Sequence, residues 1–189
     1  LTASGGSSFL WSTGQTTSSI AISPTSNTSY TVTVTSASCS DDTSITVTVN
    51  PLPVPTISGG TTICSGQSAT LTAGGGTTYS WSNGATSSSI TIFPTSNSNY
   101  VVTVTDANGC FDTTSASISV SNVTATVSPS STICGGQTVS LNASGGTNYS
   151  WNNSSTTSTI NVNPSTTTNY TVVVSEASGC SDTATTTIT

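Results

Sequence analysis

The feature that most constrains this chain is an internal repeat of about 70 residues. Trp11, Trp81 and Trp151 are 70 residues apart, and three other residue types keep the same step. Such self-similarity indicates that one folding unit occurs several times in tandem. The other positions that recur at this step are Leu1, Leu71 and Leu141; Pro24, Pro94 and Pro164; and Tyr30, Tyr100 and Tyr170.

Each repeat is a series of short runs in which apolar residues alternate with Thr or Ser. The segments 30–34, 100–104 and 170–174 carry Tyr or Val at every second position. This period of two, with many β-branched residues, is typical of a half-buried strand, and no segment has a helical period. Asn-Gly pairs at 83–84 and 108–109 favour type I′ hairpin turns. The sequence therefore predicts an all-β fold of small antiparallel β-sandwiches.

Two segments mark the expected domain boundaries. NPLPVP at 50–55 is a stiff spacer, because proline fixes φ and has no amide hydrogen to donate. A second boundary falls near 121–129. We expect three domains, at 1–52, 53–122 and 123–189, of which the first lacks the initial strand of the others.

The cysteines follow the same repeat. Cys64 and Cys134 occupy an early position in their repeats, and Cys39, Cys110 and Cys180 a late one. In both complete repeats the early cysteine precedes the late cysteine by 46 residues. This equal spacing predicts the disulfides Cys64–Cys110 and Cys134–Cys180. In the loop-entropy model each bridge would contribute about 4 kcal/mol to stability. Disulfides of this kind imply an oxidising, extracytoplasmic setting.

Cys39 has no early cysteine within the chain. Its partner is expected about seven residues before Leu1, in a longer array or in another molecule. A first repeat without its initial strand would also expose a sheet edge, and such an edge is a template for strand addition from a neighbouring subunit. The alternative is a free reactive thiol, although the chain has no His or Lys to activate it.

Composition excludes several classes of function. The chain has no Lys, Arg or His and six acidic residues, which gives a formal charge of −6. It therefore has no cations to neutralise nucleic-acid phosphates, and an anionic membrane surface would repel it. It also lacks an imidazole base, an amine nucleophile and a guanidinium clamp. We expect no catalytic residues, no cofactor, no enzymatic activity, no nucleic-acid partner and no membrane insertion.

One turn has the oxygen-rich pattern of a calcium loop. Asp106, Asn108 and Asp112 form an Asp-x-Asn-Gly-x-x-Asp sequence. The other repeats have Ser36 or Glu176 where the second has Asp106, so a tight hairpin is the favoured interpretation. We predict no metal site.

The three tryptophans raise an alternative function. Exposed aromatic rings on β-sandwiches serve as platforms for sugars, which would make the chain an array of carbohydrate-binding modules. However, the Tyr-x-Trp patterns at 79–81 and 149–151 place both rings on one face of a strand, which in a β-sandwich usually means the core. We therefore expect the tryptophans to be buried.

Four motifs recur in a constant order and carry a resemblance. In residues 63–110 they are Cys-Ser-Gly-Gln, Tyr-Ser-Trp-Ser-Asn-Gly, a Pro before a Tyr, and Thr-Asp-Ala-Asn-Gly-Cys; the third repeat departs mildly, with Asn-Asn-Ser at 152–154. Over essentially its whole length the chain resembles the Ig-like or PKD-like tandem repeats of large surface and secreted adhesins of Bacteroidetes, including gliding-motility adhesins and cargo of the type IX secretion system.

This resemblance implies tandem Ig-like sandwiches in an extracellular or cell-surface scaffold, secreted as part of a long adhesin, stalk or filament. The expected partners are neighbouring repeats of the same chain, identical subunits in a filament, and surface polysaccharide. An Asp-Thr pair follows each late cysteine and is similar to the O-glycosylation motif of Bacteroidetes. The alternative is an acid and a threonine that begin an edge strand. The candidate O-glycan sites are Thr43, Thr113 and Thr183.

Overall fold

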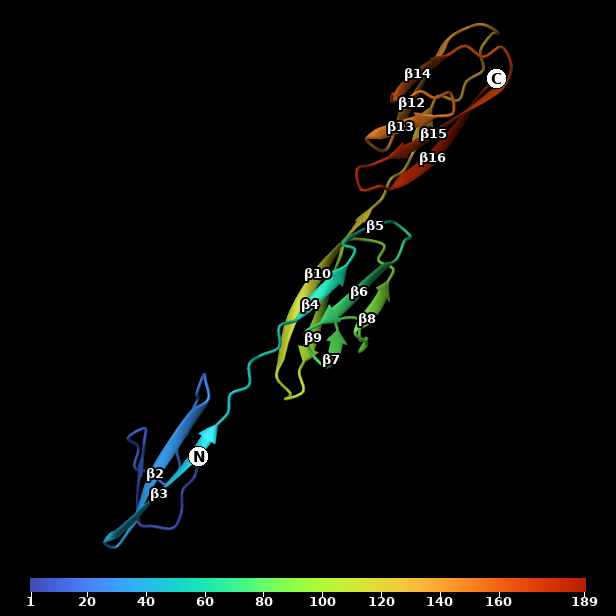
Figure 1. Ribbon diagram of the computed structural model, residues 1–189. Helices are drawn as coiled ribbons and strands as arrows, with labels where there is room; N and C mark the ends of the chain where they lie inside the picture. The colour runs from blue at the N-terminus through green and yellow to red at the C-terminus, as the bar shows by residue number, and fades with distance from the viewer. The chain divides into compact units, whose positions relative to one another are not determined.

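The computed structural model describes all 189 residues, and its regular elements are β-strands without any helix. The prediction of an all-β fold is therefore confirmed, and no helix exists that could cross a membrane. The chain divides into two compact units, Leu1–Leu52 and Pro53–Thr189. Figure 1 shows the two units and labels most of their strands. The limit between the units falls inside the proline-containing segment.

The first unit is a single three-stranded antiparallel sheet in the order β1-β2-β3. β2 and β3 form a long hairpin whose register runs from Thr28 opposite Val47 to Ser36 opposite Cys39. A lone antiparallel bridge between Thr2 and Ser19 is what remains of a second sheet in these residues. The strands are β1 (Ser8–Trp11), β2 (Thr28–Ser36) and β3 (Cys39–Val47).

Residues 53–122 of the second unit form a complete sandwich of two sheets, in the orders β5-β10-β9-β7 and β4-β6-β8. All neighbours pair antiparallel except β5, which runs parallel to the end of β10. The predicted antiparallel sandwich is confirmed, and the short parallel strand β5 is an addition to it that the sequence did not indicate. The strands are β4 (Thr56–Gly59), β5 (Thr62–Cys64), β6 (Ala69–Gly74), β7 (Thr78–Trp81), β8 (Ser89–Ile92), β9 (Ser98–Thr105) and β10 (Phe111–Ser121).

Residues 123–189 repeat this arrangement with the sheets β11-β12-β14 and β13-β15-β16. The counterpart of β5 shrinks to one parallel bridge, between Ser131 and Ile188. The strands are β11 (Thr126–Ser128), β12 (Val139–Ser144), β13 (Asn148–Trp151), β14 (Thr159–Val162), β15 (Thr168–Ser175) and β16 (Ser181–Ile188).

Every repeat has a hydrophobic core of its own. In β9 the alternation predicted from sequence buries Val102 and Val104 completely, and in β15 it does the same for Val172 and Val174. The two cores of the second unit are separate clusters. Because burial of one such side chain is worth about 1.5–3 kcal/mol, each complete repeat has a local source of stability. The core of the first unit is smaller, with Trp11, Ile20 and Val32 as its buried members.

The Asn-Gly turns are not of type I′. Positive φ occurs at the glycines, 86° at Gly84 and 83° at Gly109, and not at the asparagines before them. Type I′ requires positive φ at both central residues, so that prediction is wrong. At the first turn the Trp81 amide donates to the Ala85 carbonyl at 2.8 Å, and the Gly84 amide donates back to the Trp81 carbonyl at 2.8 Å.

The third repeat has Ser154 where the second has Gly84, and Ser154 also takes a positive φ, of 68°. A side chain in this left-handed region costs about 1 kcal/mol, which glycine avoids. We therefore expect Ser154→Gly to raise the free energy of unfolding by roughly 0.5–1 kcal/mol in urea titrations. Ser165→Gly is the matched control, because Ser165 is exposed and has an ordinary φ. An equal gain from both variants would refute the strain argument.

Candidate functional site: a covalent joint between repeats

The disulfide in this structure joins two different repeats. Cys64, at the end of β5, is bonded to Cys180, 116 residues later, with the two Cα atoms 5.4 Å apart. Cys39, Cys110 and Cys134 are free. The predicted bridges Cys64–Cys110 and Cys134–Cys180 within single repeats are therefore wrong. A partner for Cys39 outside the chain stays a prediction.

The length of β10 explains the error. Cys64 lies opposite Ser121 at the end of β10, whereas Cys110 immediately precedes Phe111 at its start. β10 has 11 residues. At about 3.3 Å per residue, the two cysteines of the repeat are about 35 Å apart, but a disulfide requires Cα atoms within about 7 Å. Each cysteine of the repeat is therefore out of reach of the other.

The third repeat places its two cysteines at opposite ends of its last strand in the same way. Cys180 immediately precedes Ser181 at the start of β16, while Cys134 follows Ile133, whose amide donates to the carbonyl of Thr189 beyond the end of that strand. Each complete repeat thus presents its late cysteine at the start of its last strand and its early cysteine at the other end. The early cysteine of the second repeat therefore meets the late cysteine of the third.

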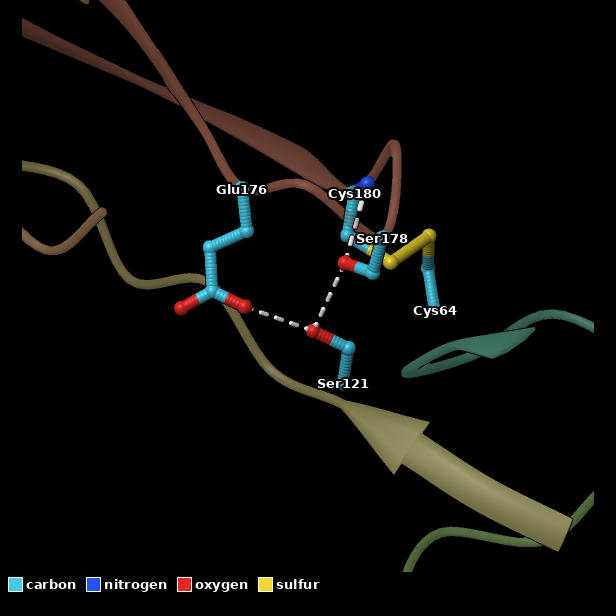
Figure 2. Close-up of a disulfide and its surroundings, with 5 residues drawn as sticks. All are labelled: Cys64, Ser121, Glu176, Ser178 and Cys180. Carbon is cyan, nitrogen blue, oxygen red and sulfur yellow. Dashed lines mark hydrogen bonds between the residues drawn. A yellow bond between two sulfur atoms is a disulfide. The ribbon is translucent and has the colours of Figure 1, made fainter. Parts of the chain in front are cut away.

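Polar side chains surround this disulfide. The Ser121 hydroxyl donates to Glu176 Oε2 at 2.9 Å, and the Ser178 hydroxyl donates to Ser121 Oγ at 3.1 Å. Figure 2 shows this chain of hydrogen bonds beside the Cys64–Cys180 bridge. Cys180 is 3% exposed, so the bridge is largely shielded from solvent on that side. We call Cys64, Ser121 and Ala125, together with residues 176–182, the joint.

Asp182, near the start of β16, is hydrogen-bonded to Ala125, which directly precedes β11 in the same repeat. Its Oδ2 accepts a hydrogen bond from the Ala125 amide at 2.9 Å, and its Oδ1 accepts one from the Thr183 amide at 2.8 Å. These two bonds stabilise the charged carboxylate and lower the pKa of Asp182 below its ordinary value of 3.8. Because the folded carboxyl binds a proton less readily than the unfolded one, its contribution to stability is complete above pH 3.8 and is lost as the pH falls through the lowered pKa.

We expect Asp182→Asn to reduce the free energy of unfolding of the third repeat at neutral pH, because the charged acceptor of the Ala125 amide is lost. Its difference from the wild type should shrink as the pH falls below 3.8, and urea titrations from about pH 6 to pH 2 measure this. Asp112→Asn is the matched control, since Asp112 accepts from its neighbour Thr113 at 2.7 Å and not from a residue distant in sequence. A difference that is independent of pH would contradict the account.

The tryptophans are core residues, as predicted. Trp11, Trp81 and Trp151 are 4%, 3% and 3% exposed. Each indole N–H donates to a backbone carbonyl six residues later; these are the carbonyls of Thr17, Ser87 and Thr157, at 2.9, 2.9 and 2.8 Å. A buried ring with its polar atom satisfied cannot stack on a sugar, so the tryptophans are not carbohydrate platforms.

The acidic turn of the second repeat is used by its own backbone. Asp106 Oδ1 accepts hydrogen bonds from the amides of Asn108 at 2.8 Å and Cys110 at 2.9 Å. No group of three or more His, Cys, Asp or Glu side chains is gathered as metal ligands. The carboxylate caps the turn that presents the late cysteine.

The candidate glycan sites lie on exposed strand positions. Strand register places Asp41, and not Asp42, at the position of Asp112, because Asp41 lies opposite Val34 as Asp112 lies opposite Val104. The Asp-Thr pair of the first repeat is therefore shifted by one residue from its counterparts, and glycosylation stays a prediction. All three candidate threonines are exposed; they are Thr43, Thr113 and Thr183.

An apolar face of the first unit is open. Ile45 on β3 is 53% exposed. In the second repeat, Ile57 of β4 and Ile63 of β5 pack against the core, and residues 1–52 contain no counterparts of these strands. The opening is a pocket of about 470 Å³ whose apolar lining includes Leu1, Trp11, Tyr30, Val32, Val34 and Ile45.

No protein-family model matches this chain, and no curated protein matches it either. Among solved structures it is similar to three N-terminal domains of the highly immunogenic outer capsid protein of bacteriophage RB49, with 21% identity and a TM-score of 0.40, over 72% of this chain and 58% of that one. It is also similar to extracellular domains 3–5 of Drosophila OTK, with 11% identity and a TM-score of 0.37, over 86% of this chain and 70% of that one. In fold, the chain is all-β, with two-sheet sandwiches repeated in tandem, as expected for Ig-like domains.

Proposed function

We propose that this chain is an extracellular structural and adhesive scaffold, part of a long surface adhesin, stalk or filament. The observation that carries the proposal is the Cys64–Cys180 disulfide, which joins successive repeats instead of closing each one. A covalent bond at a joint limits bending and separation of neighbouring domains. These are the motions that a load-bearing scaffold must restrict.

The disulfide also changes the path that tension takes through the chain. A force applied beyond the two repeats runs from residue 53 to Cys64, across the sulfur atoms to Cys180, and on to residue 189. Residues 65–179 lie outside this covalent path. Unfolding of either core therefore does not lengthen the molecule by the intervening chain while the disulfide is intact.

The open apolar face of residues 1–52 supports assembly along one axis. Strands equivalent to β4 and β5 would cover Ile45 and the pocket beneath it. They would come from a preceding part of one continuous chain or from an identical subunit, by strand addition to the sheet. Either source gives a linear array, in which the neighbouring repeats are the partners.

Chemistry and composition agree with a location outside the cell. The joint needs an oxidising setting to keep its disulfide. A chain without Lys, Arg or His has no general base or amine nucleophile, which supports a role other than catalysis. Nothing in the site favours the carbohydrate-binding alternative, because the tryptophan rings are buried. Surface polysaccharide as a ligand, the link to gliding motility and type IX secretion, and the O-glycans stay predictions.

Single-molecule stretching of residues 53–189 from its two ends tests the scaffold proposal. Before reduction, forced unfolding should release only the short outer segments. After reduction, the 115 residues between Cys64 and Cys180 should add about 400 Å of contour length. The Cys64→Ser variant should show the long extension without reductant, and Cys134→Ser should behave like the wild type, since Cys134 is free. Long extensions in the unreduced wild type would contradict the proposal, and saturable binding of polysaccharide would favour the carbohydrate alternative.

A further inference from the structure

Cys110 lies in the same kind of turn as the bonded Cys180. The Asp106 amide donates to the Cys110 carbonyl at 2.9 Å, as the Glu176 amide donates to the Cys180 carbonyl at 3.0 Å. The glycine directly before each cysteine has a positive φ, which is 83° at Gly109 and 85° at Gly179. Cys110 is therefore presented as Cys180 is, at the start of the last strand of its repeat.

Cys134 likewise lies in the same turn as the bonded Cys64. The Gln67 amide donates to the Cys64 carbonyl at 3.0 Å, and the Gln137 amide donates to the Cys134 carbonyl at 3.0 Å. Each turn contains a glycine of positive φ, which is 82° at Gly66 and 84° at Gly136. Cys134 is free and exposed in this structure. Cys134 lies beyond the end of β16, and in the same way Cys64 lies alongside the end of β10.

We propose that the three free cysteines form disulfides with further repeats of the same type, in the register of Cys64–Cys180. Each early cysteine then bonds the late cysteine that follows it by 116 residues. Cys110 takes an early cysteine about seven residues upstream of Leu1, and Cys39 takes one a whole repeat earlier. Cys134 takes a late cysteine near position 250. The single rule accounts for all five cysteines.

This inference rests on the proposed scaffold function and deepens it, because it identifies the partner at each joint as another repeat. It also corrects the expected partner of Cys39. The early position about seven residues before Leu1 is assigned to Cys110, since Cys39 would be separated from it by the length of the last strand, β3, just as Cys110 is separated from Cys64. Every joint of the array then carries one disulfide.

The bridges form by thiol–disulfide exchange with an oxidised dithiol oxidoreductase or a small-molecule disulfide. One cysteine thiolate attacks the disulfide of the oxidant and forms a mixed disulfide, and the second thiolate then displaces the oxidant. The cysteine pair loses two protons and two electrons, and the oxidant is reduced to thiols. No group of the scaffold itself needs to act as a catalyst.

Peptide mapping of the intact native protein without reduction tests the register. The chain has no Lys or Arg, so pepsin or chymotrypsin replaces trypsin for the digest. We expect no alkylatable thiol at Cys39, Cys110 or Cys134. Each should be linked to a peptide of the opposite type, early to late, that comes from outside residues 1–189. Free thiols at these positions, or bridges between two cysteines of one repeat, would overturn the proposal.

A second experiment uses an extended chain, in which a second copy of residues 53–122 is inserted after residue 122. The proposed register predicts two disulfides, each between neighbouring repeats, and three free thiols. Bridges within repeats would instead give three disulfides and one free thiol. Replacing the inserted early cysteine by serine should free the late cysteine of the last repeat and leave the other bridge intact.

The two proposals fail in different ways. If the bridges lie within repeats but the stretched molecule still resists extension, the register is wrong and the scaffold function survives. If the register is found as proposed but the chain binds polysaccharide saturably, the carbohydrate-binding alternative replaces the scaffold function and the register survives.

Discussion

Replacing Cys64 with serine should lower the free energy of unfolding of residues 53–189 by about 4–5 kcal/mol. The disulfide closes a loop of 116 residues, and in the loop-entropy model a loop of this size restricts the unfolded chain strongly. The loss should also appear as independent unfolding of the two repeats, because the side-chain hydrogen bonds left between them at the joint are those of Ser121 with Glu176 and Ser178. Urea titration of the oxidised protein, followed by tryptophan fluorescence, measures both effects.

Cys134→Ser is the control that makes this prediction sharp. Cys134 occupies the same turn as Cys64 but is free, so its replacement should change stability by less than about 0.5 kcal/mol. Bridges within repeats would give the opposite pattern, in which the two substitutions destabilise the protein equally. Equal losses from Cys64→Ser and Cys134→Ser would therefore contradict the joint.

Trp81→Ala should destabilise the second repeat by about 3–5 kcal/mol. The ring is 3% exposed and packs in the core with Val102 and Val104. Truncation leaves a cavity, and it also removes the indole donor from the Ser87 carbonyl at 2.9 Å. If Trp81 were a sugar platform on the surface, its removal would cost little stability, so the unfolding midpoint of the variant separates the two roles.

Phe93 provides the matched aromatic control. Its side chain is 72% exposed, and it directly follows Ile92 at the end of β8 in the same repeat. Phe93→Ala should change the free energy of unfolding by less than about 0.5 kcal/mol. A loss close to that of Trp81→Ala would mean that the core described here is not the source of the repeat's stability.

The strands were predictable because two independent signals agree on them. The 70-residue step identifies equivalent positions, and the period-two alternation at Tyr100, Val102 and Val104 identifies the buried face. The burial of Trp81 followed from its position two residues after Tyr79 on one strand. Local pattern and tertiary environment point the same way here, and such consistency is typical of sequences that fold reliably.

The cysteine partners were not predictable from spacing. In a periodic chain, Cys64 lies 46 residues before one late cysteine and 116 residues before the next, and both separations fit the repeat equally well. Which late cysteine bonds to Cys64 depends on which end of the last strand each cysteine occupies. That information is in the 11-residue length of β10, from Phe111 to Ser121, which spaces the two cysteines of one repeat too far apart to bond.

The parallel pairing of β5 and the turn geometry at Gly84 were missed for a related reason. β5 has three residues, too few for a pattern that distinguishes parallel from antiparallel pairing. Asn-Gly tolerates positive φ at both residues, but a loop closed between Trp81 and Ala85 requires it at the glycine alone. The polar contacts of the joint, such as Ser121 with Glu176, left no signal in the sequence, because hydroxyl and acidic residues are ordinary on strand surfaces.

Disulfide mapping of the 189-residue chain, oxidised and alkylated before peptic digestion, tests the covalent joint most directly. We expect one linked peptide pair that contains Cys64 and Cys180, with Cys39, Cys110 and Cys134 recovered as alkylated thiols. Recovery of Cys64 linked to Cys110, together with Cys134 linked to Cys180, would contradict the joint.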